Sequence, residues 1–282
     1  MTLLQILLLA VIQGLCELLP VSSSAHVILA EKFMGLDPTT PEMTLLLVML
    51  HSGTMLAVIV YFWASWRSRY CASMPLFKRF ASDLIVATVM TGVVGLILMT
   101  IIERLVLGGT DHAEIEQLFG NTTVIACGLA IVGIMIITSA KKMQSANSSI
   151  AGGSRIAALI GTVQGLCLPF RGFSRSGSTI STGLFLGLSR DRAENFSFAL
   201  AVALTPAVMA KEGYRFMKAY SAPTSHAGPL ADLLLPDILG LVFSFAAGLI
   251  ALRWLSQWLE ADRWDVFGYY CLFAAGTVSI VG

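Results

Sequence analysis

The sequence predicts an all-α integral membrane protein built from an inverted-topology repeat, and two observations carry that prediction. Of its 282 residues, 56% are hydrophobic and only 12% are charged, which is far more apolar than the usual soluble composition. In addition, a polar interruption of the apolar runs occurs twice, in similar surroundings, about 150 residues apart. We therefore expect six transmembrane helices and two re-entrant helical hairpins in a single membrane domain, residues 1–282.

The first repeat is expected over residues 1–139. It opens with an apolar run, residues 2–19, which a polar break over residues 20–26 separates from a second, shorter run. Neither run offers the roughly 20 apolar residues that a span requires. We therefore predict a helical hairpin over 1–35 that dips into the membrane, with its irregular turn covered by protein or by a water-filled cavity. Three spans are then expected, at residues 43–66, 83–102 and 121–139.

The second repeat is expected over residues 155–282. Gln-Gly-Leu-Cys, which begins at Gln13, recurs at Gln164, and a second broken run predicts a hairpin over 156–188. Three further spans are expected, at residues 193–216, 237–258 and 264–281. An odd number of spans inverts the second repeat relative to the first, and inverted repeats with broken helices place a polar site near the bilayer midplane. We expect the two breaks to face each other there.

The distribution of charge predicts the orientation. The loops expected on one side carry 11 Lys and Arg residues, and those on the other side carry five. The positive-inside rule places the richer loops in the cytoplasm and both termini outside. A net charge of +1 gives no indication of a nucleic-acid partner. The five cysteines form no Cys-x-x-Cys pair and are expected to be small hydrophobic residues, and the N-terminus has no pattern of a cleaved signal peptide.

The second break has the composition of a phosphate-binding loop. Ser174, Arg175, Ser176 and Thr179 offer hydroxyl and guanidinium donors inside an apolar environment, where an arginine costs about 2.5 kcal/mol or more and needs a partner such as an anion. Flanking glycines let the backbone approach a ligand, and a helix starting here would add free N–H groups. Arg171 is interpreted either as a second phosphate contact or as a side chain that reaches toward the surface.

The first break offers reactive side chains. Gln13 and Glu17 are four residues apart, so on a helix they share one face. Glu17 is a candidate general base, and together with Gln13 it is a candidate ligand of a divalent cation, Mg²⁺ or Ca²⁺. A structural ion pair for Glu17 and an interhelical hydrogen bond for Gln13 are the alternatives.

Hydroxyl and imidazole groups follow directly. Ser22, Ser23 and Ser24 are candidate nucleophiles or phosphate donors, and the adjacency of the three does not decide between them. His26 can move a proton or attack phosphorus, or it can be an ordinary packing residue. His51 lies in the middle of an expected span, and a structural role is favoured for it.

These two motifs resemble those of the bacterial undecaprenyl-diphosphate phosphatases of the bacitracin-resistance type. The family's first motif, Glu or Gln followed after three residues by Glu, is met at Gln13 and Glu17, and Pro-Val-Ser-Ser and His26 follow it. Its second motif, Pro-Gly-x-Ser-Arg-Ser-x-x-Thr, is met from Gly172 to Thr179. The departure is Arg171, which replaces a proline of fixed φ with a flexible, charged residue, so phosphate affinity or turnover is expected to differ.

The resemblance implies hydrolysis of undecaprenyl diphosphate to the monophosphate at the outer face of the bacterial cytoplasmic membrane, which recycles the lipid carrier for cell-wall synthesis. It also implies dependence on a divalent cation. Glu17, Ser23, His26 and Arg175 would be the catalytic residues. A lipid-phosphate flippase that cleaves nothing is the competing interpretation, because inverted repeats are common in transporters.

Overall fold

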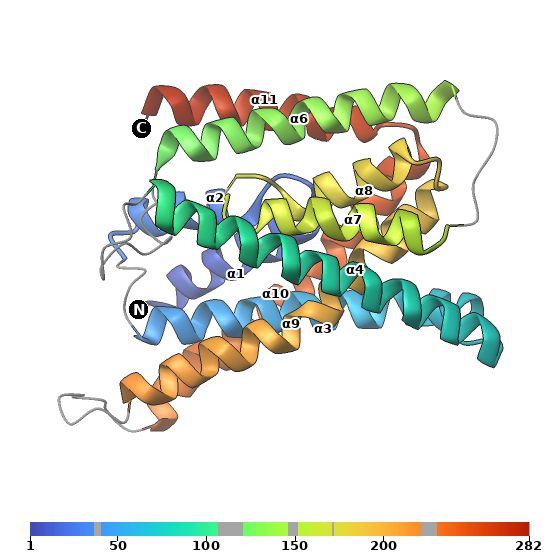
Figure 1. The fold of residues 1–282 in the computed structure, drawn as a ribbon. Coiled ribbons are helices and arrows are strands. Elements are labelled where there is room, and N and C mark those ends of the chain that lie inside the picture. Colours follow the sequence, from blue (N-terminus) through green and yellow to red (C-terminus); the bar gives the residue numbers. More distant parts are fainter. Residues whose placement is uncertain (37–40, 107–120, 146–151, 171, 221–229, 282) are drawn as a thin grey trace. The chain divides into compact units, whose positions relative to one another are not determined.

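The computed structural model describes the chain except for residues 37–40, 107–120, 146–151, 171, 221–229 and 282. Every regular element of the described part is a helix, as Figure 1 shows. In chain order they are α1 (Leu3–Leu18), α2 (Ser23–Phe33), α3 (Pro41–Arg69), α4 (Met74–Ile101), the π-helical turn η1 (Ile102–Val106), α6 (Thr122–Ser145), α7 (Ser154–Cys167), α8 (Arg175–Phe185), α9 (Arg190–Tyr220), α10 (Leu230–Glu260) and α11 (Trp264–Val281).

The order of the helices repeats. A short broken pair, α1 and α2, precedes the long helices α3, α4 and α6, and the broken pair α7 and α8 precedes α9, α10 and α11. Both breaks fall where the sequence predicts them, because each contains residues that favour turns. Ser22 has a φ of +67° in the first break, and Gly172 has a φ of +97° in the second. Positive φ is costly for serine and easy for glycine.

Within the residues that the structure describes, four helical stretches are long and apolar enough to cross a bilayer. They extend over Leu45–Arg69, Met74–Arg104, Thr122–Lys142 and Leu235–Glu260. They contain four of the six predicted spans. Helices α9 and α11 also form, but they fall outside this set. Charged residues such as Lys211, Glu212 and Arg215 dilute the apolar character of α9.

Two helix starts differ from the sequence prediction. Helix α4 begins at Met74, inside the segment 67–80 that was expected to be a loop, because Pro75 stands in its first turn, where the missing N–H of proline costs nothing. Helix α9 begins at Arg190 and so includes the short charged segment that was expected as a loop. Charged residues at a membrane boundary therefore extend these helices rather than end them.

The chain divides into two compact units, and each is described by itself. The first unit consists of residues 1–18, 23–62 and 201–254. In it, α10 packs closely on α3. A Cβ at Gly53 would lie 2.3 Å from the Leu241 carbonyl oxygen, and the Ser244 hydroxyl donates to the Leu50 carbonyl at 2.9 Å. Leu46 and Leu50 join the apolar core of this unit.

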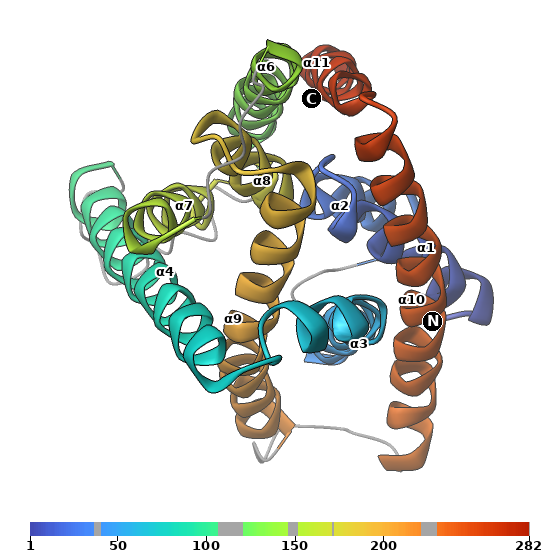
Figure 2. The ribbon, with the colours of Figure 1, turned by 90° about the vertical axis from the view of Figure 1, so that its right-hand side faces the viewer.

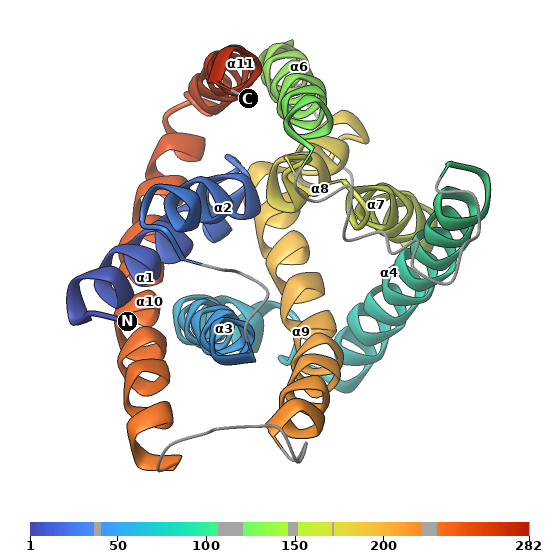
Figure 3. The ribbon, with the colours of Figure 1, turned by 90° about the vertical axis from the view of Figure 1, so that its left-hand side faces the viewer.

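The second unit consists of residues 19–22, 63–200 and 255–282. Figures 2 and 3 show α6 beside α11 and α4 beside α7. The first pair meets at two glycines. A Cβ at Gly133 would lie 2.9 Å from the Gly268 carbonyl oxygen, and one at Gly268 would lie 2.7 Å from that of Gly133. Small residues at such contacts let backbones approach, which is how membrane helices gain packing energy.

Candidate active site

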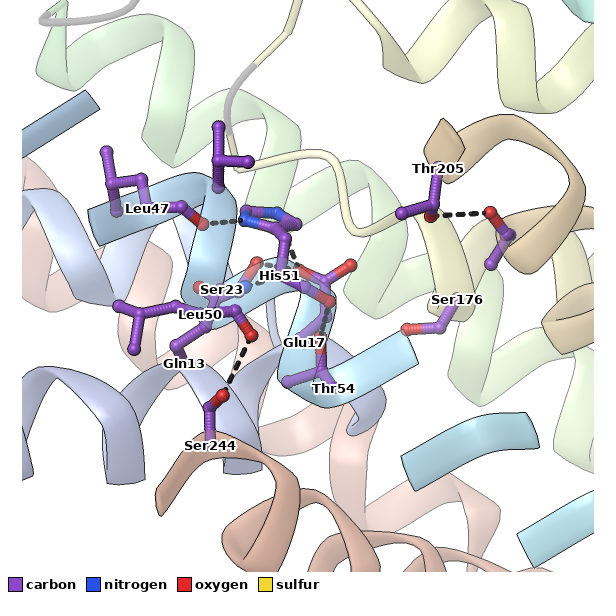
Figure 4. A network of polar contacts seen from close by, with 12 residues as sticks. Gln13, Glu17, Ser23, Leu47, Leu50, His51, Thr54, Ser176, Thr205 and Ser244 are labelled. Carbon is purple, nitrogen blue, oxygen red and sulfur yellow. Dashed lines mark hydrogen bonds and ion pairs between the residues drawn. The ribbon is translucent and has the colours of Figure 1, made fainter. Parts of the chain in front are cut away.

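In the first unit, the carboxylate of Glu17 gathers three polar side chains. Its Oε2 accepts from the Ser23 hydroxyl at 2.6 Å and from the Gln13 amide at 3.2 Å, and the His51 imidazole lies 3.5 Å away. Figure 4 shows these side chains converging from three helices. Gln13 and Glu17 share a face of α1, Ser23 is the first residue of α2, and His51 belongs to α3. The predicted carboxylate and hydroxyl therefore meet.

The hydrogen bond of His51 to its own helix determines where its proton is. Nδ1 lies 3.0 Å from the Leu47 carbonyl oxygen, and a carbonyl can only accept, so Nδ1 carries a hydrogen. Nε2 then faces the carboxylate of Glu17. An imidazole beside a carboxylate is an arrangement that can serve in proton transfer.

Exposure at the cluster is uneven. The Glu17 side chain is 10% exposed, whereas that of His51 is 45% exposed, and Gln13 is buried. The imidazole therefore lies at the open side of the cluster and the amide behind it. The carboxylate is shielded enough from water for its hydrogen bonds to be strong, while a ligand can still reach the imidazole and the Ser23 hydroxyl.

In the second unit, α8 begins with the predicted phosphate-binding residues. Ser174 caps the helix, because its Oγ accepts from the backbone N–H of Gly177 at 3.2 Å. Arg175 is half-buried in the first turn. Ser174 and Ser176 are buried with their hydroxyl oxygens 3.4 Å apart. A helix N-terminus lined by hydroxyls and a guanidinium is a site suited to an anion.

The loop before α8 is held by close contact with α6. A Cβ at Gly172 would lie 2.3 Å from the Ile125 carbonyl oxygen, so only glycine fits this backbone. At the other end of the motif, the hydroxyls of Thr179 and Ser197 are 2.6 Å apart, and both residues are buried. The Ser176 hydroxyl donates to the Leu19 carbonyl at 3.3 Å. This contact ties the phosphate loop to the turn that contains Ser22.

The remaining predicted residues are distributed as follows. His26 is half-buried on α2, three residues after Ser23. Ser22 belongs to the second unit, is buried and carries the strained positive φ, and such strain often accompanies function. Nothing is described for the Ser24 side chain, and Arg171 lies outside the described residues. The sequence interpretation missed the contact of His51 with Glu17 and that of Ser197 with Thr179.

The donor set at Glu17 bears on the predicted cation. It offers one carboxylate, one imidazole and one amide whose nitrogen points to the carboxylate. Within the described residues, no group of three or more His, Cys, Asp or Glu side chains gathers to hold a metal. This set suits a hard cation that takes a single carboxylate from the protein and its other oxygens from a phosphate and water.

Comparison with known proteins shows the family of the chain. The family model described as bacitracin resistance protein BacA matches residues 6–277. The chain belongs to the BacA family. It is 58% identical over 280 residues to undecaprenyl-diphosphatase 2 of Acinetobacter baylyi, covering 99% of this chain and 97% of that protein.

More distant BacA relatives also extend over nearly the whole chain. Undecaprenyl-diphosphatase of Thermus thermophilus is 34% identical over 267 residues, 94% of this chain and 91% of the relative. That of Rhodopirellula baltica is 28% identical over 270 residues, 96% and 94% of the two chains. The family resemblance inferred from the two motifs is therefore confirmed.

Proposed function

We propose that this BacA protein hydrolyses undecaprenyl diphosphate to undecaprenyl phosphate and inorganic phosphate, and so recycles the lipid carrier for cell-wall synthesis. The observation that carries the proposal is the contact of the Glu17 carboxylate with the Ser23 hydroxyl at 2.6 Å and with the His51 imidazole at 3.5 Å. A site that only binds a lipid phosphate needs donors for the anion and has no use for a base on a hydroxyl. The names of the relatives agree with this activity.

Arg175, Ser174, Ser176 and Thr179 are proposed to bind the diphosphate, with the N-terminus of α8 behind them. A guanidinium grips two phosphate oxygens at once and stabilises the charge that grows on them in the transition state. Ser22 and Gln13 would add donors, and Arg171 would be a further contact. Binding this head group leaves the prenyl tail to the apolar helices.

In the chemical step, an oxygen nucleophile attacks the terminal phosphorus, and the bond to the bridging oxygen breaks. Undecaprenyl phosphate is the leaving group. Glu17 is placed to accept the proton of the Ser23 hydroxyl, or of a water molecule at that position. His51 and His26 are the candidates for returning a proton to the leaving oxygen. Attack by Ser23 would form a phosphoserine that water then hydrolyses.

A divalent cation, Mg²⁺ or Ca²⁺, is proposed to be held by Glu17 together with phosphate oxygens, with the Gln13 amide turned to present its oxygen. When bound, such a cation would neutralise phosphate charge. Removal of divalent ions with a chelator should abolish phosphate release, and adding either ion back should restore it. Unchanged activity in the chelator would contradict a required cation.

The two groups of side chains belong to different units. We propose that both take part in the hydrolysis, because the two motifs occur at equivalent places in the sequence repeat.

We further propose that the protein crosses the bacterial inner membrane six times, as two inverted repeats with re-entrant pairs α1–α2 and α7–α8, and that the site opens to the outer side. The repeated order of helices and the excess of basic residues in one set of loops support this topology.

Phosphate release from farnesyl diphosphate by the purified protein in detergent tests the proposal. Wild type should release phosphate, and Glu17→Gln should reduce kcat by about 10²- to 10⁴-fold, because the base is lost while the shape is kept. Glu260→Gln, at the exposed end of α10, is the matched control and should keep full activity. Tight binding of the diphosphate by wild type without phosphate release would favour the flippase instead.

A further inference from the structure

A cavity with a volume of about 540 Å³ lies in the second unit. It is lined by the turn after α3 and by the N-terminal parts of α4, α7 and α9. Ligand pockets commonly have this size. Among the described residues, none of those assigned to phosphate hydrolysis lines it.

Positive charge predominates along its wall. Arg69, Arg79 and Arg192 line the cavity, against the two carboxylates Asp83 and Asp191. Asp191 pairs with Arg69, and Asp83 accepts a hydrogen bond from a serine hydroxyl at 3.0 Å. Arg79 is exposed and makes no ion pair with any described residue. The lining is therefore suited to an anion.

The N-terminus of α7 adds a second, independent feature. Gly153 caps this 14-residue helix without any side-chain hydrogen bond, and the first turn contains no acidic residue. Gly152 and Gly153 both line the cavity, and a Cβ on Gly153 would meet nothing within 4 Å. Among the described residues, the glycines thus place no side chain over the end of this helix. Uncovered helix N-termini attract phosphate groups.

Part of the cavity wall is apolar. The rings of Tyr70 and Phe80 stack with centroids 3.9 Å apart and planes at 7°, and Ile156 and Leu188 also line the cavity. An acyl chain could pack against these side chains, which free phosphate could not use.

The phenol of Tyr70 fits the same ligand. Burial raises the pKa of the Tyr70 hydroxyl, against a smaller lowering by the nearby Arg69 and Arg192. The hydroxyl therefore stays protonated and can donate a hydrogen bond at neutral pH. A rigid aromatic plane with a donor at its polar end is typical of the boundary between head groups and hydrocarbon.

We propose that this cavity binds an anionic phospholipid of the membrane. Its phosphate would lie between Arg79, Arg192 and the N-terminus of α7, and one acyl chain would lie against Phe80 and the other apolar side chains of the lining. Basic pockets between transmembrane helices are known to select anionic head groups. The proposal concerns a site distinct from that of the hydrolysis and does not depend on the proposed function.

Native mass spectrometry of the full chain tests it. The protein is exchanged into detergent containing equal amounts of phosphatidylglycerol and phosphatidylcholine with identical acyl chains. Wild type should retain mainly phosphatidylglycerol. Arg79→Gln should lower the ratio of the two retained lipids about fivefold, as expected for one surface charge near a head group. Lys78→Gln removes the neighbouring charge outside the cavity lining and should leave the ratio unchanged.

Further variants distinguish binding at this cavity from a folding defect and from binding at the hydrolytic site. Arg79→Lys, which keeps the charge, should restore retention, so that a simple folding defect is excluded. Arg175→Ala should retain lipid like wild type, and Arg79→Gln should keep phosphate release, so the two sites fail separately. Equal retention of both lipids by wild type, an equal drop with Lys78→Gln, or displacement of the lipid by millimolar inorganic phosphate alone would overturn the proposal.

Discussion

At the scale of single residues, the chemistry depends on how His51 is held beside Glu17. The Nδ1–H bond to Leu47 orients the ring, and Ser244 fixes the adjacent turn through its bond to Leu50. His51→Asn keeps a donor near the Nδ1 position and removes Nε2. We expect kcat for phosphate release to fall about 10²-fold, with a much smaller change in KM, because a proton-transfer group is lost.

A substitution at the next residue of α3 serves as the control for His51→Asn, because it alters the packing of the helix without removing a proton-transfer group. The Ser52 hydroxyl bonds the Val48 carbonyl within α3 at 2.6 Å, so Ser52→Ala perturbs the helix and leaves the contact of His51 with Glu17 in place. It should keep kcat near the wild-type value. Equal losses in the two variants would show that His51 only stabilises α3.

Arg175 allows a test of geometry at constant charge. Arg175→Lys keeps the cation and loses the planar fork that grips two oxygens. We expect kcat/KM for farnesyl diphosphate to fall about tenfold for the lysine variant, and about 10²- to 10³-fold for Arg175→Ala. If Arg175→Lys were as active as wild type, Arg175 would contribute only its positive charge and not its two parallel hydrogen bonds.

Most members of the cluster around the Glu17 carboxylate could be predicted from the sequence, but the presence of His51 in it could not. Gln13 and Glu17 share a face by helical spacing alone, and the break that follows brings Ser23 back to them. His51 is 34 residues farther along, in the middle of an apolar helix. Its position beside Glu17 depends on how α3 packs, which no local pattern encodes. Ser197 was missed for the same reason.

At the scale of elements, the phosphate loop depends on a contact that a methyl group would destroy. Gly172→Ala must place a Cβ 2.3 Å from the Ile125 carbonyl at a φ of +97°. We expect a loss of about 1–3 kcal/mol in unfolding free energy and impaired phosphate release. Thermal unfolding in detergent measures the first effect.

Gly92→Ala, inside α4, is the matched control for this prediction. A Cβ there meets nothing within 4 Å, so the variant should be neutral or more stable by about 0.5–1 kcal/mol, since alanine favours a helix. If Gly172→Ala proved as stable as Gly92→Ala, the loop would not be held by α6.

Helix ends were the least predictable elements. Arg67 to Phe80 looked like one basic loop, yet only Tyr70 to Ser73 separates α3 from α4. Lys and Arg favour loops by composition but are good helix formers, and Pro75 starts α4 instead of preventing it. The breaks at Ser22 and Gly172 were predictable because glycine, proline and serine clusters have few other uses in an apolar chain.

At the scale of the whole molecule, the orientation in the membrane is open to a direct test. Cys71 is exposed in the turn between α3 and α4, on the side that the positive-inside rule assigns to the cytoplasm. In a variant with Cys71 as its single cysteine, a membrane-impermeant maleimide should label inverted vesicles and spare intact spheroplasts.

A second site, on the opposite side of the predicted topology, controls for access. Lys32→Cys in a cysteine-free background is exposed in the last turn of α2, and it should show the reverse labelling. If both cysteines were labelled from one side, α3 would not cross the membrane and the proposed topology would be wrong.

The repeat was visible in the sequence because a broken pair and three long helices follow each other twice. The division into two compact units was not visible, since each unit combines segments from both ends of the chain. Pairing between distant helices depends on which surfaces fit together. Gly161, for instance, fits only because a Cβ there would lie 2.2 Å from the Ala87 carbonyl oxygen.

The glycine contact between α6 and α11 gives the C-terminal helix an influence on catalysis at a distance. Lipid tails are as apolar as a leucine side chain, so these two helices associate through close packing of their backbones. A methyl group at Gly268 would push the two backbones apart. Val132 and Ile136 of α6 also support Gly177 in the first turn of α8. A substitution at Gly268, far along the chain from the phosphate loop, would thus shift the start of α8 and displace the hydrogen-bond donors proposed to bind the substrate. It would do so without contacting those donors.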